Sequence, residues 1–433
     1  MKKKILQKIL KILAKKVLNK YKPDVIGITG SVGKTSSKEA IYTVLKGSKK
    51  RVRQTPESYN NEIGVPLTIL GMILPYTFIG WLKVFIRGFG LILSRDKSYP
   101  EILVLEMAAD HPGDIKYLTE LAPCKIGVVT AIAPVHLEFF RTVENIAKEK
   151  QVLVSHLKSD NWAVLNGDDD LTFEMQEKTQ AKVLTFGFLD RVRVKAKEPM
   201  ISHETGTQGQ ELISGMNFKL SYKGSAVPVL LSGALGEHQI YSALAAATVG
   251  VIYDLNLVEI SQALRNYRSP RGRMNLIKGI KHTLIIDDTY NSSPKAAFAA
   301  LEVLKKFPLK EGKRKFAVLG DMLELGSFTR EGHEEVGRRA FEAGLDGLIT
   351  VGEKARDIAV GARESGLSQD KIFTFSDTDK AGQFLQQRIK EGDLILIKGS
   401  QGMRMEKIVK EIMDEPLKAN ELLVRQDESW EKR

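Results

Sequence analysis

The clearest pattern of apolar and polar positions in this chain stands near its N-terminus. A β-branched apolar run, Val25 to Ile28, predicts a buried strand, and the helical pattern that opens at Lys34 ends near Gly47. Between the two stand Gly30 and Gly33, three residues apart. A strand, a glycine turn and a helix in this order favour a loop whose backbone N–H groups and helix N-terminus bind phosphate.

The residue types in this loop make the prediction of phosphate binding more specific. It is a T-G-x-x-G-K-T variant of the phosphate-binding pattern, and the first glycine of the general G-x-x-x-x-G-K-[ST] form stands one place early, at Gly27. Lys34 would supply a charge for the β- and γ-phosphates, and the Thr35 hydroxyl a ligand for Mg²⁺. The alternative is a glycine turn that binds nothing, but the Lys34-Thr35 pair would then have no packing role at this position.

Two more apolar runs end near polar side chains. The run Ile102 to Leu105 predicts a buried strand with Glu106 at its carboxyl end, where ligands bind in parallel α/β sheets. Glu106 is therefore a candidate ligand for Mg²⁺. A second run ends five residues before His136, which is either a satisfied polar residue or a ligand, and a helical pattern carrying Lys150 follows.

The second half of the chain predicts a second sheet. The run Ser269-Pro270-Arg271-Gly272-Arg273 combines Pro, Gly and charge and favours a domain boundary. Beyond it strands and helices alternate. We expect an α/β protein with a central P-loop ATPase domain, residues 23–268, whose sheet is mostly parallel, then a C-terminal Rossmann-like α/β domain, residues 269–416, and a polar tail, residues 417–433.

Two segments have amphipathic or strongly apolar patterns. Residues 1–22 predict a basic amphipathic helix, which could lie on anionic lipid or dock on its own domain. The apolar insert at about residues 71–93 contains Lys83 and Arg87, which disfavour a membrane span. It could form an interfacial helix or be buried under a neighbouring domain.

Composition excludes several classes of protein. The 433 residues are 43% apolar and 27% charged, which are ordinary values for a globular protein. A single cysteine, Cys124, excludes a disulfide framework and favours the cytoplasm. Peripheral contact at the inner face of the membrane, through residues 1–22 and 71–93, is left open. The net charge is +12, but residues 1–22 hold nine lysines and no acid. Because the basicity is local, we expect no nucleic-acid partner.

The order of the motifs is more specific than any one of them. Over about residues 24–415 the chain resembles the Mur ligases, ATP-dependent amide-bond-forming enzymes of peptidoglycan precursor synthesis. The resemblance rests on the phosphate loop and on eight further motifs: Tyr59-Asn60-Asn61-Glu62-Ile63-Gly64-Val65-Pro66, Glu106-Met107-Ala108-Ala109-Asp110-His111-Pro112-Gly113-Asp114-Ile115, His136-Leu137-Glu138, Ile146-Ala147-Lys148-Glu149-Lys150, Arg271-Gly272-Arg273-Met274, Asp287-Asp288-Thr289-Tyr290-Asn291, Leu319-Gly320-Asp321-Met322-Leu323-Glu324-Leu325-Gly326 and Lys398-Gly399-Ser400.

The resemblance implies a role for each matching position. The residues that would hold ATP are Thr29, Gly30, Ser31, Val32, Gly33, Lys34, Thr35, Asn60, Asn61, His238, Ser242, Arg273 and Asp288. Those that would hold Mg²⁺ are Thr35, Glu106, His136 and, as a carbamate, Lys150. Those that would seat the incoming amine are Tyr290, Asn291, Lys398 and Ser400. Lys34, Lys150, His136 and Arg273 would be catalytic.

The resemblance also implies a reaction and its partners. A substrate carboxylate would form an acyl phosphate with ATP, and an amine would then displace phosphate. The likeness is greatest to members that add D-alanyl-D-alanine to a UDP-N-acetylmuramoyl tripeptide, so the implied partners are a UDP-sugar peptide or related cell-wall precursor and a dipeptide or other amine.

Departures from the family pattern keep two alternatives open. Only about 24 residues precede the nucleotide strand, where peptidoglycan members carry a domain for the UDP group, and Ser242, Ser293 and Gln401 replace two expected asparagines and an arginine. One alternative is a Mur-type ligase with a lipid-linked or other non-UDP acceptor, such as a folate. The other is a P-loop membrane-associated regulatory module without ligase chemistry.

Overall fold

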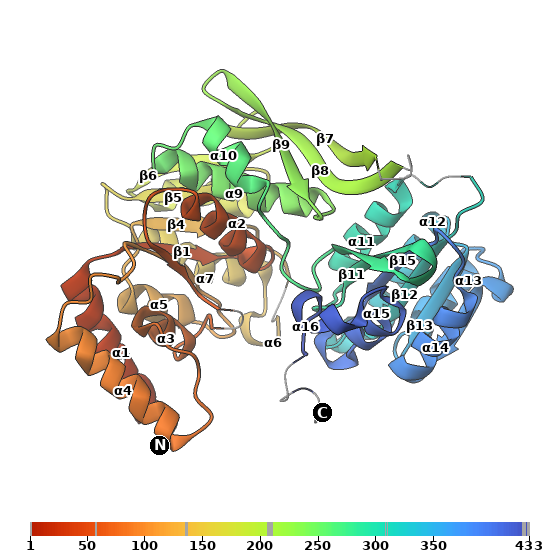
Figure 1. The fold of residues 1–433 in the computed structure, drawn as a ribbon, viewed down its shortest axis with the longest axis horizontal. Helices are drawn as coiled ribbons and strands as arrows, with labels where there is room; N and C mark the ends of the chain where they lie inside the picture. Colours follow the sequence, from red (N-terminus) through yellow and green to blue (C-terminus); the bar gives the residue numbers. More distant parts are fainter. Residues whose placement is uncertain are drawn as a thin grey trace. The chain divides into compact units, whose positions relative to one another are not determined.

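The computed structural model describes residues 2–56, 59–134, 137–205, 211–307, 309, 311–426 and 430. The chain divides into two compact units, and both are α/β, as the sequence predicts. The first unit comprises residues 1–202, 216–232 and 237–268, and the second comprises residues 203–215, 233–236 and 269–433. Figure 1 shows the elements of each unit.

The first unit is built on a nine-stranded sheet. The strands β1 to β7 pair in parallel, as predicted for the central domain. In spatial order the strands are β2 (Val52–Gln54), β3 (Ile102–Glu106), β1 (Asp24–Thr29), β4 (Ile126–Val129), β5 (Trp162–Asn166), β6 (Lys182–Gly187), β7 (Val194–Thr205), β8 (Glu211–Tyr222) and β9 (Ser225–Ser232).

Helices cover both faces of this sheet, so its central strands are buried and can be apolar throughout. One face carries α2 (Lys34–Lys46) and α9 (Glu237–Ile252), and the other carries α5 (Asp114–Leu121) and α7 (Val143–Ser155) (Figure 1). The remaining helices of this unit are α1 (Lys2–Tyr21), α3 (Gly64–Leu70), α4 (Phe78–Leu93), α6 (Leu137–Phe140), α8 (Asp170–Phe173) and α10 (Leu257–Leu264).

The strand order brings the predicted site residues to one edge of the sheet. β1 lies between β3 and β4, with Ile28 opposite both Glu106 and Val128. The chain runs from β1 outward to β2 and returns, so the strand order reverses beside β1. In open α/β sheets ligands bind outside the carboxyl ends of strands at such a reversal.

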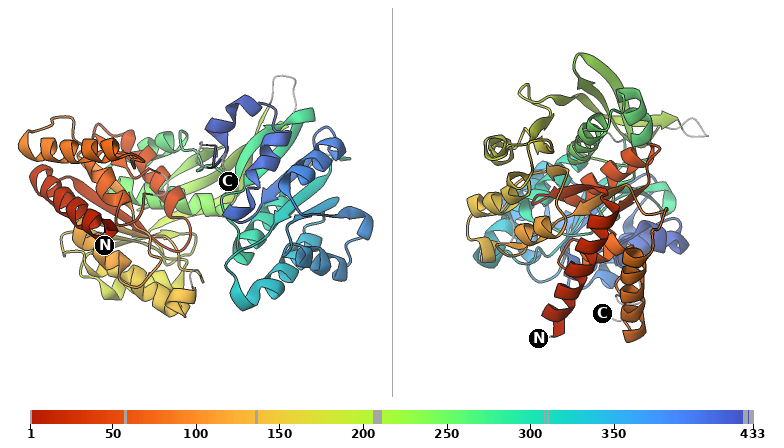
Figure 2. Two further views of the ribbon diagram at one scale, coloured as in Figure 1. Left: turned by 90° about the horizontal axis from the view of Figure 1, so that it is seen from below. Right: turned by 90° about the vertical axis from the view of Figure 1, so that its left-hand side faces the viewer.

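The basic helix α1 docks on its own domain, which was one of the two interpretations left open. Its buried apolar side chains are Leu10, Leu13, Ala14, Val17 and Leu18, and they belong to the main core of the unit. Figure 2 shows α1 and α4 side by side in two views. Within this unit α4 buries Val84, Gly88 and Leu91 on one face only. None of the described helices is long and apolar enough to pass through a bilayer.

The second unit contains a six-stranded sheet in a Rossmann-like arrangement. Its strands in spatial order are β10 (Asn275–Gly279), β11 (Thr283–Asp288), β15 (Leu394–Lys398), β12 (Lys315–Gly320), β13 (Gly347–Val351) and β14 (Ile372–Phe375). Only the edge strand β10 is antiparallel to its neighbour. The helices are α11 (Pro294–Lys306), α12 (Thr329–Glu342), α13 (Arg356–Glu364), α14 (Thr378–Arg388), α15 (Glu406–Ile412) and α16 (Ala419–Leu422).

The boundaries of the units differ from the predicted ones at three places, the first being residues 203–215, which group with the second unit. Residues 233–236 group with the second unit because Ala234 pairs with Asn275 and the Leu276 N–H donates to the Gly233 carbonyl. The prediction of a polar tail from residue 417 was wrong for its first part. Ala419 and Leu423 are buried in the second core, because the apolar positions of this short segment face the sheet.

Candidate active site

The phosphate loop has the backbone geometry that its glycines predict. Gly30 has φ +147° and Gly33 has φ +82°, values that side chains with a Cβ rarely adopt. A Cβ at Gly30 would also stand 2.0 Å from the Thr130 Oγ1 atom. Gly33 directly precedes α2, so the N-terminus of that helix opens at Lys34 and Thr35. The positive end of the helix dipole therefore faces the loop.

Hydrogen bonds to the segment after β4 hold the loop in place. The Ser31 N–H donates to the Ala131 carbonyl at 2.7 Å, and the Thr130 hydroxyl donates to the Val32 carbonyl at 2.6 Å. The Lys34 ammonium lies over the loop and donates to the Gly30 carbonyl at 2.7 Å. The loop is thus preorganised, with its lysine placed where phosphate oxygens would bind.

Glu106 and Asn60 meet beside this loop. Glu106 is buried at the end of β3, and the Asn60 side-chain amide donates to its Oε1 at 3.1 Å. Asn61, which was predicted to bind ATP together with Asn60, stabilises the chain that follows it. Its side-chain oxygen accepts from the N–H groups of Ile63 and Gly64, so it holds the start of α3.

Lys150 lies in the same neighbourhood, on α7. Its side chain is 2% exposed, and burial, followed by the nearby Lys34 ammonium, lowers the pKa of Lys150 to about 7. The carboxylates of Glu149, Asp110 and Asp114 act in the opposite direction. A lysine with this pKa is largely a neutral amine near pH 7.5, which is the form that reacts with CO₂ to give a carbamate.

Two carboxylates that the site prediction did not include fix the loop between β3 and α5. Glu149 accepts the N–H groups of Gly113 and Ile115, at 2.9 and 2.8 Å, and so caps α5. Asp114 accepts the N–H groups of Asp110 and His111. Asp114 is an acid directly after a glycine at the start of a helical pattern, which is a sequence signal that could have identified it. Glu149 lies in the middle of α7, so the sequence offered no such signal for it.

The remaining predicted metal ligand, His136, lies outside the described residues. Within the part of the chain that the structure describes, no three His, Cys, Asp or Glu side chains gather as a metal site. Of the predicted magnesium ligands, the structure describes Glu106, Thr35 and Lys150, and a carbamate on Lys150 would add a negative oxygen ligand.

The two residues predicted to contact adenine are placed differently from each other. His238 is exposed at the start of α9, whereas Ser242 is 1% exposed and its hydroxyl points to the His238 carbonyl within the helix. A cavity of about 420 Å³ opens next to them, lined by Asp168, Phe188, Leu189, Pro199, Glu237 and Tyr241.

Aromatic side chains and a carboxylate shape this cavity. The Tyr241 hydroxyl donates to Asp168 at 2.9 Å, and the Tyr241 ring meets Phe188 edge to face at 5.0 Å between centroids. The neighbouring Asp169 accepts the Ile132 N–H at 3.1 Å, which joins the cavity to the segment that holds the phosphate loop. The sequence did not predict that these residues form a cavity, because neither segment alone shows that α9 packs beside β5.

A second cavity of about 520 Å³ lies against the first turns of α7. It is lined by Pro112, Phe139, Phe140, Arg141, Asn145, Lys148 and Glu149. Arg141 and Lys148 are exposed, and Phe140 is buried beneath them. The cavity thus combines cationic side chains with an apolar floor, within two residues of Lys150.

In the second unit the predicted substrate residues gather at the carboxyl ends of β11 and β15. The Lys398 ammonium pairs with Asp288 at 2.7 Å and donates to the Asn291 carbonyl at 2.9 Å. Lys398 and Ser400 are each 2% exposed. The Ser400 hydroxyl accepts the Leu323 N–H. Asn291 is exposed, so it can reach a ligand, whereas Lys398 and Ser400 support the loop.

Arg273 and Tyr290 form a second group in this unit. The Arg273 guanidinium lies 4.0 Å from the centre of the Tyr290 ring, and the Tyr290 N–H donates to the Gly272 carbonyl at 2.9 Å. The buried Arg425 donates to the Tyr290 carbonyl at 3.1 Å and pairs with Glu406 at 2.9 Å. Arg425 comes from the predicted polar tail, so the sequence offered no signal for it.

A phosphate loop on the central strand of a parallel sheet, followed by a Rossmann-like unit, defines the class of P-loop nucleotide-binding α/β proteins. Residues 28–78 and 88–250 match the Mur ligase middle domain, and residues 272–401 match the Mur ligase glutamate ligase domain. The chain belongs to the Mur ligase family, and it is accordingly an ATP-dependent acid–amino-acid ligase.

Its similarity to individual members extends over most of the chain. It is 30% identical to the UDP-N-acetylmuramoyl-tripeptide–D-alanyl-D-alanine ligase of Bacillus subtilis, over 94% of this chain and 80% of the relative. Among solved structures it resembles the MurF ligase of Thermotoga maritima in complex with ADP, with 31% identity, a TM-score of 0.74 and coverage of 96% and 84%. It also resembles MurF of Acinetobacter baumannii, with 26% identity and a TM-score of 0.75, over 93% of this chain and 79% of that structure's chain.

Proposed function

We propose that this ligase adds D-alanyl-D-alanine to the tripeptide of a UDP-N-acetylmuramoyl precursor, in the cytoplasm. The acceptor carboxylate attacks the γ-phosphorus of ATP, the bond from that phosphorus to the β–γ bridging oxygen breaks, and ADP leaves. The dipeptide amine then attacks the acyl carbon, loses a proton and expels phosphate. The observation that carries the proposal is the grouping of Lys34, Glu106 and Lys150 at the end of β1 and β3, in a chain similar to enzymes named for this reaction.

The reaction brings two anions together, so charge neutralisation is the main requirement on the protein. Lys34 and the α2 N-terminus are proposed to meet the phosphates, and Arg273 is a further proposed phosphate contact. Mg²⁺, held by Thr35, Glu106 and the Lys150 carbamate, would neutralise phosphate charge when bound. Glu106 fits this role because it is a buried carboxylate with one oxygen already oriented by Asn60.

The two cavities of the first unit suit the two substrates of the first step. The cavity beside Lys150 carries Arg141 and Lys148, which suit a peptide acceptor with several carboxylates. The cavity around Tyr241 has aromatic walls and joins the phosphate loop through Asp169, which suits the adenine base. Asn291 and Tyr290 in the second unit are proposed to contact the dipeptide.

The direct test measures which pair of substrates the enzyme joins. We expect phosphate release from ATP only when a UDP-N-acetylmuramoyl tripeptide and D-alanyl-D-alanine are both present, with a product mass equal to their sum less one water. Parallel reactions replace the acceptor by a lipid-linked glycopeptide or a folate, and the dipeptide by D-alanine alone. Turnover with one of these and none with the UDP-linked tripeptide would contradict the proposed acceptor.

Replacing Tyr241 by Leu tests the proposed adenine cavity. Because the substitution removes both the aromatic surface and the hydrogen bond to Asp168, we expect KM for ATP to rise about tenfold with kcat little changed. Tyr222→Leu, another tyrosine of the same unit, is the control. An unchanged KM for ATP in Tyr241→Leu would place the adenine elsewhere.

A further inference from the structure

An apolar strip lies exposed along α4. The strip consists of Phe78, Ile79, Leu82, Ile86, Phe89 and Leu93, which are 48–85% exposed. They recur at helical spacing on the face opposite the buried Val84, Gly88 and Leu91. Contiguous apolar surface of this kind marks an interaction site.

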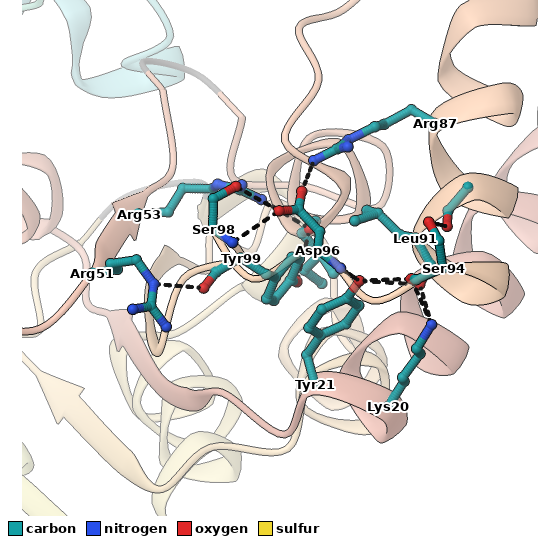
Figure 3. A network of polar contacts seen from close by, with 12 residues as sticks. Lys20, Tyr21, Arg51, Arg53, Arg87, Leu91, Ser94, Asp96, Ser98 and Tyr99 are labelled. Atoms are coloured by element: carbon teal, nitrogen blue, oxygen red, sulfur yellow. Dashed lines mark hydrogen bonds and ion pairs between the residues drawn. The ribbon is translucent and has the colours of Figure 1, made fainter.

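Polar contacts hold α4 firmly against α1, so the strip is presented on a fixed element (Figure 3). The Lys20 ammonium of α1 donates to the carbonyls of Leu91, Ile92 and Ser94 at the end of α4, at 2.6–2.9 Å. Arg87 pairs with Asp96 at 2.8 Å, and the Tyr21 hydroxyl accepts the Asp96 N–H. The two helices pack closely at Gly88 of α4, where a Cβ would stand 3.2 Å from the Leu13 side chain of α1.

The charged side chains of the two segments that contain α1 and α4 are all basic. Residues 1–22 and 71–93 contain no Asp or Glu, and they carry nine lysines and the pair Lys83 and Arg87 respectively. The side chains of Lys4, Lys8, Lys15, Lys16 and Lys83 are exposed. A second copy of this face would bring lysines against lysines, whereas an anionic surface would be attracted to them.

We infer that α1 and α4 together form a docking surface for the anionic lipid headgroups of a bilayer. The strip would enter the boundary between headgroups and acyl chains, and the lysines would meet lipid phosphates. α4 has 16 residues, or about 24 Å of helix, which is too short to cross a hydrocarbon core of about 30 Å. It would therefore lie in the plane of the membrane.

The match to the family model does not extend over the whole of this surface. The two stretches that match the Mur ligase middle domain leave out residues 79–87, which form the centre of α4, and they begin after α1. Most of the surface thus lies outside the stretches matched to the family model. Its test is independent of the ligase activity, because lipid binding is measured without substrates.

The experiment is co-sedimentation of the full chain with vesicles. We expect binding to equimolar phosphatidylcholine and phosphatidylglycerol, little binding to phosphatidylcholine alone, and release as NaCl rises from about 0.05 to 0.5 M. The double variant Ile86→Ser, Phe89→Ser should bind at least about tenfold more weakly, because both side chains face solvent and contribute apolar area only to the bilayer. Phe328→Ser, an equally exposed aromatic of the second unit, should bind like wild type.

A matched pair of charge variants separates this surface from the overall positive charge. The triple variant Lys8→Glu, Lys15→Glu, Lys16→Glu should lose about tenfold or more in affinity for the anionic vesicles. The triple variant Lys178→Glu, Lys305→Glu, Lys354→Glu has the same charge change at exposed positions elsewhere and should keep its binding. Circular dichroism spectra like that of wild type verify that each variant is folded.

Three outcomes would overturn the inference. The first is no wild-type binding to the anionic vesicles. The second is equal loss in the two triple variants, which would show attraction to net charge alone. The third is a strip variant that keeps lipid binding but loses self-association in sedimentation velocity, which would assign the strip to a second copy of the chain.

Discussion

Replacing Lys34 by Ala should reduce kcat/KM for the ligase reaction by about 1000-fold. The Lys34 ammonium lies over the phosphate loop, 2.7 Å from the Gly30 carbonyl, where we propose that it meets the negative charge of the nucleotide. In phosphoryl transfer the protein acts mainly by positioning and by neutralising charge, so the loss should fall on the formation of acyl phosphate. Steady-state release of phosphate from ATP, with both co-substrates present, measures the effect.

The control for this prediction lies on the same helix. Lys46 is exposed in the last turn of α2, and Lys46→Ala removes the same charge at the far end from the loop. It should change kcat/KM less than about twofold. If Lys34→Ala retained a tenth or more of wild-type activity, the loop would not be the phosphate site.

Replacing Lys150 by Arg should lower kcat by about 100-fold or more, although a long basic side chain is kept. An arginine remains protonated and cannot form a carbamate, and its cation would stand beside Lys34. In the proposed carbamylation the neutral amine would attack CO₂ and lose a proton, which would create an anion at the same place. Lys34, which disfavours the ammonium, favours this anion.

The pH dependence of carbamate formation follows from the direction in which the pKa of Lys150 is shifted. Since the pKa of Lys150 is lowered to about 7, the amine is neutral above that pH and protonated below it. Enzyme depleted of CO₂ should therefore regain activity on addition of bicarbonate at about pH 8 and regain little at about pH 6. With ¹³C-labelled bicarbonate, a carbamate signal should appear in NMR spectra of wild type and be absent from Lys150→Arg.

Lys158→Arg is the matched control for this substitution. Lys158 is exposed shortly after α7, and its replacement should leave activity, bicarbonate dependence and the carbamate signal unchanged. Full activity of Lys150→Arg in CO₂-free buffer would exclude a carbamate at this position.

The local parts of the site could be predicted from the sequence. The strand before Gly30, the positive φ angles at Gly30 and Gly33 and the helix that opens at Lys34 depend on residues within about ten positions of one another. Glu106 was also identifiable, because an acid directly after a buried apolar run stands at the carboxyl end of a strand. The alternation of strands and helices after Ser269 likewise predicted the second sheet.

Other features depend on contacts between distant segments. Arg425 reaches the Tyr290 carbonyl across 135 positions, and nothing in the tail predicted that its arginine would be buried. The meeting of Tyr241 with Asp168 spans 73 positions and creates the aromatic cavity. The amphipathic pattern of α1 was compatible with lipid or with its own domain, and packing against α3 and α4 decided which face is buried.

The sequence by itself determined the two α/β sheets, the phosphate loop and the family, because these follow from short-range backbone preferences and from the order of local motifs. Only the tertiary structure decided that Lys150 is buried beside Lys34, that Ser242 faces its own helix and that one face of α4 is exposed. The reason is physical: burial, pKa and exposure depend on what packs around a side chain, and those neighbours come from segments far away in the chain.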